Sequence, residues 1–293
     1  MPELPEAETI VEGLRGPVVG RSFSLVQVLR EDLLNTSADN FSQALSGGSI
    51  AKIFRRGKNV VLRIEIESGS RPNALLLVVN LGMSGRLLHQ AHADRSNPPS
   101  HPGVLFYLDD RSLLVYHDVR RFGRLTLMTP TFYRTWSRAM GPEPLSPSFT
   151  EWDLIRTLTR SRSPIRSWLL DQKRVAGVGN IYANEALWRA GIHPKRPAQK
   201  VTPEEGRRLH RSLRKVLRAA IAARGTTLRD YRTAEGWEGG YASELSVYSR
   251  QGSPCKRCGN TIEKLSFGGR SAFFCPTCQP PPRESARDTS AFR

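Results

Sequence analysis

The four cysteines constrain the fold of this chain most, because all of them fall in one short segment near the C-terminus. Sixteen residues, 259–274, separate the pair Cys255 and Cys258 from the pair Cys275 and Cys278. This spacing is typical of zinc sites built from four thiolates. Four protein ligands leave no position for a reactive water, so we expect one structural zinc ion. We expect no organic cofactor. An iron–sulfur cluster or free thiols are the alternatives.

The residues between the two cysteine pairs predict a β-hairpin. Apolar residues flank Gly268-Gly269, which would form the turn, so Arg270 would lie near the tip. An arginine there could reach a phosphate backbone, and a solvated turn arginine is the other interpretation. Zinc hairpins of this kind indicate nucleic-acid binding without indicating catalysis.

The charge of the chain points to a polyanionic partner. Lys and Arg number 44 against 27 Asp and Glu, which gives a formal net charge of +17 and a pI near 10.5. Such an excess favours DNA or RNA as partner, although a merely basic surface is also consistent with it. The longest apolar run, residues 74–79, is too short to cross a bilayer. The first ten residues lack a basic apolar leader. We therefore expect no membrane partner and a cytoplasmic location.

The full length of 293 residues predicts two hydrophobic cores. The first half of the chain has a strand-like pattern. Short apolar segments indicate strands at 60–66, 74–81, 105–108, 113–116 and 125–128. They predict a β-sandwich or barrel. A helix is expected at 6–14, entered through Pro5, and a surface loop is expected at 89–103.

The second half has a helical period. Residues 129–150 contain Pro130, Pro142, Pro144 and Pro147, which predicts an irregular linker. Helices are expected at 151–159, 165–171, 181–190 and 203–223, the last with Thr202 as N-cap and Glu205 completing a capping box. The tail from Gln279 is polar and proline-rich, which is typical of disorder. The fold class is α+β with several domains.

Six separated motifs resemble the formamidopyrimidine-DNA glycosylases, in that family's order and over almost the whole chain up to about residue 279. They are the N-terminal Pro2-Glu3-Leu4-Pro5-Glu6, Arg55-Arg56-Gly57-Lys58, Leu81-Gly82-Met83-Ser84-Gly85, the segment from Asp118 to Gly123 with Arg120-Arg121-Phe122, the segment Gly177-Val178-Gly179-Asn180-Ile181-Tyr182, and the cysteine module. One departure is Asn80, where many members carry histidine. A weak effect on local packing or on DNA contact is expected from it.

The resemblance implies a domain organisation. A catalytic β-sandwich domain with flanking helices would span 1–130, and a hinge linker 131–150. A helical DNA-binding domain with a helix-two-turns-helix element would span 151–248, a β-hairpin zinc finger 249–279 and a disordered tail 280–293. Damaged double-stranded DNA would be the partner of a monomeric enzyme.

The resemblance also implies a chemistry. The chain would be a bifunctional DNA glycosylase and AP lyase of base excision repair, removing 8-oxoguanine and formamidopyrimidines and cutting the strand by β,δ-elimination. Loss of Met1 exposes the amine of Pro2, whose pKa near ~8 leaves it partly unprotonated at neutral pH. That amine would be the nucleophile, and Glu3 would transfer protons. Glu6 would approach the same site or stabilise the helix N-terminus. Lys58 would contact the phosphate next to the lesion.

The remaining candidates would bind DNA. Met83, Arg120 and Phe122 match the family's insertion residues, which fill the gap left by an extruded nucleotide; without the family, Met83 and Phe122 are interpreted as core residues. The exposed amides and the Asn180 side chain at a helix N-terminus would bind phosphate, together with Lys173 and Arg270. Residues 225–241 would form a mobile loop over the extruded base.

Two other functions remain open at this point. A non-catalytic zinc-ribbon protein would explain the charge and the cysteines but not Pro2, Glu3 and Glu6. An endonuclease VIII-like glycosylase for oxidised pyrimidines is the second alternative, and Leu4, Arg120 and Phe122 favour the purine branch over it. The sequence does not predict the preferred lesion or opposite base.

Overall fold

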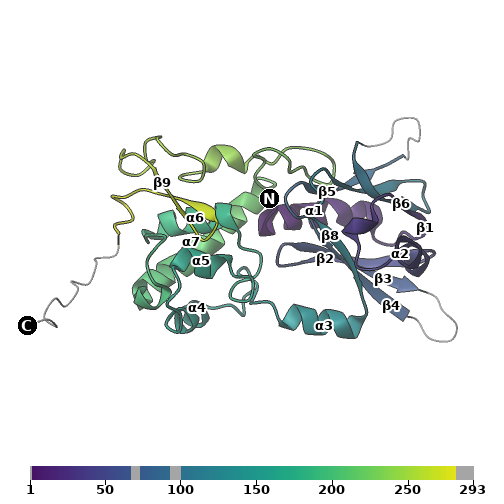
Figure 1. The fold of residues 1–293 in the computed structure, drawn as a ribbon, viewed down its shortest axis with the longest axis horizontal. Helices are drawn as coiled ribbons and strands as arrows, with labels where there is room; N and C mark the ends of the chain where they lie inside the picture. The colour runs from purple at the N-terminus through teal and green to yellow at the C-terminus, as the bar shows by residue number, and fades with distance from the viewer. Residues whose placement is uncertain (1, 67–72, 93–99, 282–293) are drawn as a thin grey trace, which may run out of the picture. The chain divides into compact units, whose positions relative to one another are not determined.

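The computed structural model describes residues 2–66, 73–92 and 100–281 (Figure 1). By its internal contacts the chain divides into two compact units. The first unit comprises residues up to Pro144, Val175–Val178 and Leu217–Glu244, and the second comprises Leu145–Arg174, Gly179–Val216 and the residues from Leu245 onward. Each unit is described by itself. The domain boundaries expected from the sequence stay a prediction.

The first unit contains two four-stranded sheets, and within each sheet all neighbouring strands are antiparallel. One sheet has the order β1-β6-β7-β5 and the other β2-β3-β4-β8. The strands are β1 (Phe23–Val28), β2 (Ser49–Arg56), β3 (Asn59–Ile66), β4 (Asn73–Asn80), β5 (Gly85–Gln90), β6 (Pro102–Leu108), β7 (Leu113–Asp118) and β8 (Arg124–Met128). The expected strands are confirmed, within a few residues at their ends.

The core of the first unit lies between the two sheets. Val60, Leu62 and Ile64 of β3 and Phe106 of β6 belong to one buried cluster, which also includes residues of helix α1 (Leu4–Val18) and helix α2 (Ala38–Leu45). Because strand side chains alternate between faces, Val61 lies on the other face of its sheet. There it joins a second cluster that is packed against helix α3 (Pro130–Arg138). The expected β-sandwich with flanking helices is confirmed.

Helix α3 corrects the expectation that residues 129–150 lack regular structure. Thr129 is its N-cap, with the side-chain oxygen accepting from the Phe132 N–H at 3.3 Å, and Pro130 lies in the first turn. A proline there loses no helical hydrogen bond, because the first amides of a helix have no partner within it. Only 139–150 are irregular. Strands β1, β2 and β5 and helix α2 were also missed. Strands β1 and β2 each contain an irregularity of register, at Phe23/Leu25 and at Ile50/Lys52, which interrupts the alternation of their side chains.

The second unit is helical and ends in a hairpin. Its helices are α4 (Glu151–Leu158), α5 (Ile165–Leu170), α6 (Asn180–Ala190) and α7 (Pro203–Ala222). The last six residues of α7, from Leu217, belong to the first unit. Strands β9 (Glu263–Phe267) and β10 (Arg270–Phe274) form the hairpin. Short 3-10 helices occupy η1 (Glu31–Leu33), η2 (Ala198–Lys200) and η3 (Tyr241–Glu244). The helix-two-turns-helix expectation is met by α5, the turns at 171–179 and α6.

The start of α7 and the end of the cysteine module can each be compared with the sequence prediction. The Thr202 hydroxyl accepts from the Glu205 N–H at 3.2 Å and the Glu205 carboxylate from the Thr202 N–H at 2.9 Å, which confirms the capping box. Gln279, expected to begin the disordered tail, is instead fully buried, and its side chain donates to the Ile192 carbonyl at 2.9 Å. Residues 282–293 of the expected tail and 93–99 of the expected surface loop lie outside the described residues. None of the described helices is long and apolar enough to cross a membrane.

Candidate active site and nucleic-acid interface

The start of α1 holds the candidate nucleophile and the candidate proton-transfer group in the first unit. Glu3 is the N-cap of the helix, and its backbone N–H donates to Glu6 Oε2 at 2.8 Å, completing a capping box. Pro5 lies in the first turn, where its missing N–H has no cost. Pro2 is buried, and Glu3 and Glu6 are each 1 % exposed. The sequence motif therefore folds into a helix start that fixes the backbone next to Pro2.

Glu6 binds backbone on both of its oxygens. Oε2 accepts from Glu3, and Oε1 accepts from the Thr226 N–H at 2.8 Å, so the carboxylate links the helix start to the segment 225–241. In that segment Tyr231 is buried, and burial, followed by the charge of Glu6, raises the pKa of its phenol. The phenol therefore stays neutral and donates to the Arg224 carbonyl at 3.2 Å. Of the two roles expected for Glu6, this geometry favours stabilising the helix start.

Lys58 lies on the turn between β2 and β3, which the fold brings next to the start of α1. Gly177 lies against both: its carbonyl accepts from the Leu4 N–H at 3.0 Å, and a Cβ on Gly57 would come within 3.4 Å of its amide nitrogen. Gly57 has a φ of +61°, and a Cβ at this position would lie 2.5 Å from Met140 Cε, so the turn favours glycine there. The two backbone segments that carry Pro2, Glu3 and Lys58 thus both lie against Gly177.

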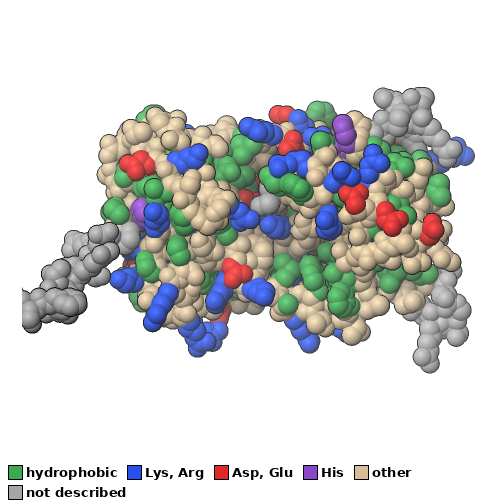
Figure 2. Space-filling view, in the orientation of Figure 1, with side chains coloured by type: hydrophobic (Ala, Val, Ile, Leu, Met, Phe, Trp, Pro, Cys, Tyr) green, Lys and Arg blue, Asp and Glu red, His purple; other side chains and the backbone are tan. Residues whose placement is uncertain are grey.

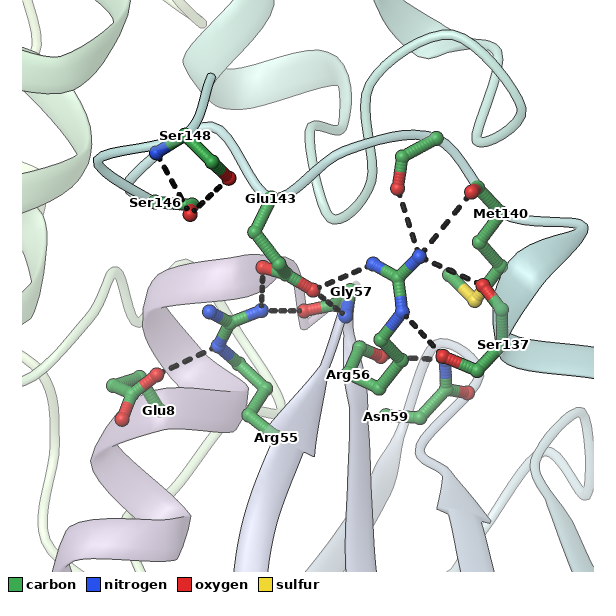
Figure 3. Close-up of polar contacts among 11 residues, drawn as sticks. Glu8, Arg55, Arg56, Gly57, Asn59, Ser137, Met140, Glu143, Ser146 and Ser148 are labelled. Carbon is green, nitrogen blue, oxygen red and sulfur yellow. Dashed lines mark hydrogen bonds and ion pairs between the residues drawn. The ribbon is translucent and has the colours of Figure 1, made fainter. Parts of the chain in front are cut away.

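A network of ion pairs sets the position of this turn (Figure 3). Glu143 accepts from the Gly57 N–H at 2.7 Å and pairs with Arg55 Nη1 at 2.6 Å and Arg56 Nη1 at 2.8 Å. Arg55 Nε also pairs with Glu8 of α1 at 2.7 Å. Because Arg55 and Arg56 are only 9 % and 14 % exposed, these pairs are shielded from water and more persistent than surface ion pairs.

Arg56 anchors the network to the end of α3. Its guanidinium donates to the carbonyls of Ser137, Met140 and Gly141 at 2.9, 3.2 and 2.8 Å (Figure 3). Glu143 lies in the proline-containing segment that the sequence predicted to be a plain linker. Its role was missed, because its arginine partners are 87 and 88 residues away along the chain.

Met83, Arg120 and Phe122 lie on two adjacent loops of the first unit. A Cβ on Gly82 would come 2.5 Å from the Phe122 carbonyl carbon, so the loops are in direct contact. All three side chains are exposed, Met83 by 37 % and Phe122 by 56 %, and the Arg120 guanidinium lies 4.9 Å from the Phe122 ring centre. The interpretation of Met83 and Phe122 as core residues is therefore wrong. Exposed apolar side chains of this size are typical of a binding surface.

Buried polar groups hold these loops. Asp118 accepts from the Ser84 hydroxyl at 2.6 Å and from the Gly123 N–H at 2.8 Å, and Ser84 in turn accepts from the Arg120 N–H at 3.0 Å. Asn80, the departure from the family pattern, accepts from the Gly82 N–H at 3.0 Å and donates to Asn59 at 2.8 Å. Asn80 thus supports the Met83 loop. Arg121 pairs instead with Asp32 at 3.3 Å.

In the second unit, Asn180 begins α6 and faces the hairpin. Its amide donates to the Ser271 carbonyl at 3.0 Å, and its Oδ1 accepts from Arg166 at 3.3 Å. The side chain therefore joins the helix start to β10. Arg270 is exposed at the start of β10, after Gly268 and Gly269 with φ of +60° and +71°, as the hairpin prediction required. Lys173 is exposed between α5 and α6.

Arg166 is a functional candidate that the sequence did not reveal. It is 1 % exposed and donates to the carbonyls of Phe267 and Arg270 at 3.1 and 2.8 Å, while its guanidinium stacks 4.3 Å from the Phe267 ring centre. No carboxylate among the described residues forms an ion pair with it. Burial, followed by the charge of Arg270, lowers its pKa. An arginine between Ile165 and Ser167 on a short helix gives no sign that it points inward.

The four cysteines converge as their spacing predicted. All four Sγ atoms lie within 4.8 Å of one another, with the sulfurs of Cys258 and Cys275 3.4 Å apart and those of Cys255 and Cys278 4.0 Å apart. Zn–S bonds of about 2.3 Å in a tetrahedron place sulfurs about 3.8 Å apart. The Arg257 N–H and the Trp188 indole donate to Cys255 Sγ at 3.4 Å, an arrangement that favours thiolate. The residues present fit one zinc ion.

The basic surface expected from the composition is visible on the face drawn in Figure 2, where Lys and Arg side chains are spread over both units and acidic side chains are fewer. Spread of this kind suits a ligand with many negative charges along its length.

Comparison with known proteins decides the family. Three family models match in chain order: the formamidopyrimidine-DNA glycosylase N-terminal domain at residues 1–125, its H2TH domain at 140–232, and a zinc finger found in FPG and IleRS at 252–281. A formamidopyrimidine-DNA glycosylase of Heliobacterium modesticaldum is 41% identical over 95% of this chain and 100% of its own length. One of Laribacter hongkongensis is 42% identical over 95% of this chain and 100% of its own length.

The chain belongs to the formamidopyrimidine-DNA glycosylase family. Solved structures agree. A mutant of the Lactococcus lactis FPG, in complex with a Fapy-dG containing DNA, superposes with a TM-score of 0.86 at 31% identity over 96% of this chain and 100% of that one. The MutM (FPG) protein from Thermus thermophilus gives 0.81 at 40% identity, over 95% and 98%.

This membership excludes one of the two functional alternatives, the non-catalytic protein, and leaves the preference for oxidised purines over pyrimidines a prediction. The glycosylase is an enzyme of DNA repair that binds DNA, a DNA glycosylase with AP lyase activity. The interpretation as a non-catalytic zinc-ribbon protein was therefore wrong. The zinc-finger match, together with the four clustered cysteines, confirms the expected zinc module. A monomeric state and a cytoplasmic location stay predictions.

Proposed function

We propose that the glycosylase removes the oxidised purines 8-oxoguanine and formamidopyrimidines from duplex DNA and cleaves the strand by β,δ-elimination through a Schiff base on Pro2. The observation that carries this proposal is the start of α1, where Pro2 and Glu3 are buried and the adjacent backbone is held by Glu6. A fixed nucleophile beside a fixed carboxylate satisfies the geometric requirement of covalent catalysis.

In the proposed reaction the Pro2 nitrogen forms a bond to C1′ of the damaged nucleotide while the bond from C1′ to the base breaks. The base leaves with a proton, and Glu3 transfers the proton that opens the sugar ring. Because the amine is secondary, the product is a cationic iminium between the Pro2 nitrogen and C1′, which withdraws electrons from the neighbouring C2′. The C2′ proton becomes acidic, and its removal expels the 3′ phosphate. Elimination on the other side of the sugar expels the 5′ phosphate.

Lys58 would bind the phosphate beside the lesion. Support comes from the turn that carries it, which lies against Gly177 together with Leu4, and from the Glu143 network that holds this turn. A cation placed beside the reacting sugar would keep the phosphate at a fixed distance from Pro2.

Met83, Arg120 and Phe122 would enter the duplex where the damaged nucleotide leaves it. Their exposure on two adjacent loops supports this role, and Arg120, stacked on Phe122, is better placed than Arg121, which pairs with Asp32. Arginine can hydrogen-bond an orphaned cytosine, and phenylalanine can separate two stacked bases.

Lys173, Arg270 and the α6 start at Asn180 would bind backbone phosphates. The zinc would be structural: Cys255, Cys258, Cys275 and Cys278 supply all four ligands and hold the hairpin that carries Arg270. Phosphate contacts position the protein on DNA without reading its sequence.

The test is to trap the covalent intermediate. Borohydride added during reaction with an 8-oxoguanine duplex should reduce the iminium and leave a protein–DNA adduct, which peptide mass analysis should locate at Pro2. A chain that retains Met1, verified by mass, should give no adduct and no strand scission while still binding the duplex. Normal cleavage by that blocked chain would refute the mechanism, and an adduct on a lysine would reassign the nucleophile.

A further inference from the structure

A pocket of the second unit lies among arginines that none of the proposed DNA contacts uses. Its volume is about 370 Å³. It is formed by the C-terminal end of α6, one face of α7 and the first cysteine pair, and its lining residues are Trp188, Arg189, Arg208, Arg211, Ser212 and Arg257. We call it the arginine pocket.

The arginine pocket has an excess of positive charge. Arg208 and Arg211 share a single carboxylate, Glu204, at 3.9 Å each, and Glu204 is closer to Arg207, at 3.2 Å. Within the part of the chain that the structure describes, Arg189 and Arg257 have no ion-pair partner. Four guanidinium groups surround the pocket, and Glu204 is the one carboxylate that pairs with any of them among the described residues. The four groups repel one another, and an anion bound between them would remove this repulsion.

Part of this cluster has a structural role. Arg257 donates to the Arg189 carbonyl at 3.2 Å and stacks 4.5 Å from the Trp188 ring centre, and Arg208 donates to the Ala190 carbonyl at 3.4 Å. Cations at the C-terminus of a helix stabilise its last carbonyls. This role does not account for Arg189 and Arg211, which are exposed and whose side chains cap no carbonyl among the described residues.

The arginine pocket is at the far end of α6 from the proposed phosphate contacts of this unit. Asn180 begins α6, and Trp188 lies eight residues later, which is about 12 Å along a helix. Arg270 is likewise at the turn of the hairpin, whereas Arg257 lies between the cysteines at its other end. One phosphate cannot bind both places.

We propose that the arginine pocket is a second nucleic-acid site, which binds a backbone phosphate of a DNA segment other than the one holding the lesion. Arginine forks match the geometry of phosphate oxygens. An acidic peptide is the less suitable ligand, because peptide docking depends on apolar anchors and the one large apolar lining residue, Trp188, is only 8 % exposed. Such a site lets the enzyme hold a second duplex while the lesion site is occupied.

The experiment saturates the lesion site of the full chain with a short duplex that carries a stable abasic-site analogue, and then titrates a labelled undamaged duplex at low salt. The wild type should bind the second duplex. The double variant Arg189→Glu and Arg211→Glu should lose at least about tenfold of that affinity, and the slope of log K against log salt should fall by about 1.8 if two phosphate contacts are lost.

The matched control is the double variant Arg156→Glu and Arg160→Glu, which makes the same change of net charge at two exposed arginines, one on α4 and one just after it, both outside the pocket. It should keep the second-duplex affinity near the wild-type value. All variants should retain zinc, melt at the wild-type temperature and cut a short lesion duplex at the wild-type rate, so that this test is independent of the Pro2 mechanism. A single duplex per chain in the wild type would overturn the proposal. Equal losses in the control and the double variant would also overturn it, as would a poly-glutamate peptide binding where duplex does not.

Discussion

The start of α1 in the first unit and the start of α6 in the second are built on buried charges of opposite sign. Glu6 and Arg166 are each 1 % exposed, and each binds backbone groups from two segments: Glu6 accepts from Glu3 and Thr226, and Arg166 donates to Phe267 and Arg270. Burying a charge costs several kcal/mol unless hydrogen bonds satisfy it. In each unit a buried ion is therefore hydrogen-bonded to the candidate functional residues: Glu6 to Glu3, and Arg166 to Asn180 and Arg270.

The difference in sign suits the ligand at each place. A carboxylate near Pro2 keeps the start of α1 polar and acidic, where the proposed mechanism requires proton transfer. A cation behind Asn180 and Arg270 adds positive potential where phosphate would bind. The two units thus hold their candidate functional residues in the same way, through a buried ion that is hydrogen-bonded to backbone groups, and they differ in the sign of that ion.

The largest effect on activity is expected from changes at the start of α1, beside the proposed nucleophile. Glu3→Gln preserves shape and removes the titratable carboxylate, so base excision should slow by about 10²–10⁴-fold while binding is largely unchanged. Glu6→Gln should differ, because an amide cannot accept from both Glu3 and Thr226 N–H groups. Its unfolding free energy should fall by about 1–3 kcal/mol. Single-turnover kinetics and denaturant unfolding separate the two, and a fully active Glu3→Gln would remove the proton-transfer role.

Removal of zinc tests the proposed phosphate contacts of the second unit, at the hairpin and at the start of α6. Loss of metal from Cys255, Cys258, Cys275 and Cys278 should unfold the hairpin, which would remove the proposed phosphate contact of Arg270 and the carbonyl partners of Arg166. Two charged hydrogen bonds are worth about 3 kcal/mol, so duplex affinity should fall about a hundredfold. The variant Cys258→Ser should lose duplex affinity to a similar extent. Added zinc should restore the affinity of the metal-stripped wild type but not that of the variant. Purified protein without metal in elemental analysis would contradict the site.

The Glu143 network connects sequence-distant segments to the start of α1. Glu143→Gln leaves Arg55 and Arg56 without their shared carboxylate, so stability should fall by about 3 kcal/mol and the Lys58 turn should shift. Cleavage at low substrate should slow about tenfold, because a displaced cation binds the phosphate less well. Glu65→Gln is the control, since its pairing with Arg63 is half exposed, at 48 % and 50 %, and should matter little. Equal effects of both changes would make the network unimportant.

Elements with local signals could be predicted from the sequence, and contacts between distant segments could not. The cysteine spacing, Pro5 in the first turn of α1, the capping box of α7 and the apolar runs of β3 and β4 carry their information within a few positions. Arg166 and Glu143 do not, because one points inward from a short helix and the other pairs with arginines 87 and 88 residues away. Phe122 was ambiguous for the same reason: its exposure depends on how its loop packs on Gly82.

The smallest effect is expected from the phosphate contacts taken singly. Asn180→Ala removes a side chain that donates to Ser271 at 3.0 Å and accepts from Arg166, so both the α6 start and its junction with the hairpin should loosen. Loss of one hydrogen bond of about 1 kcal/mol predicts about fivefold weaker binding.

Because phosphate contacts position without reading sequence, damaged and undamaged duplexes should weaken alike for Asn180→Ala and for Arg270→Ala. The change at Arg270 should also lower the salt slope by about 0.9, since one cation is lost, whereas the change at Asn180 should leave the slope intact. Gln199→Ala, an exposed amide of the same unit, should do neither. Titrations of both duplexes at several salt concentrations decide the matter. If either change altered lesion preference at undiminished affinity, the start of α6 or the hairpin beside it would be reading the lesion, and the division between a reacting site at α1 and a phosphate-binding site at α6 would no longer hold.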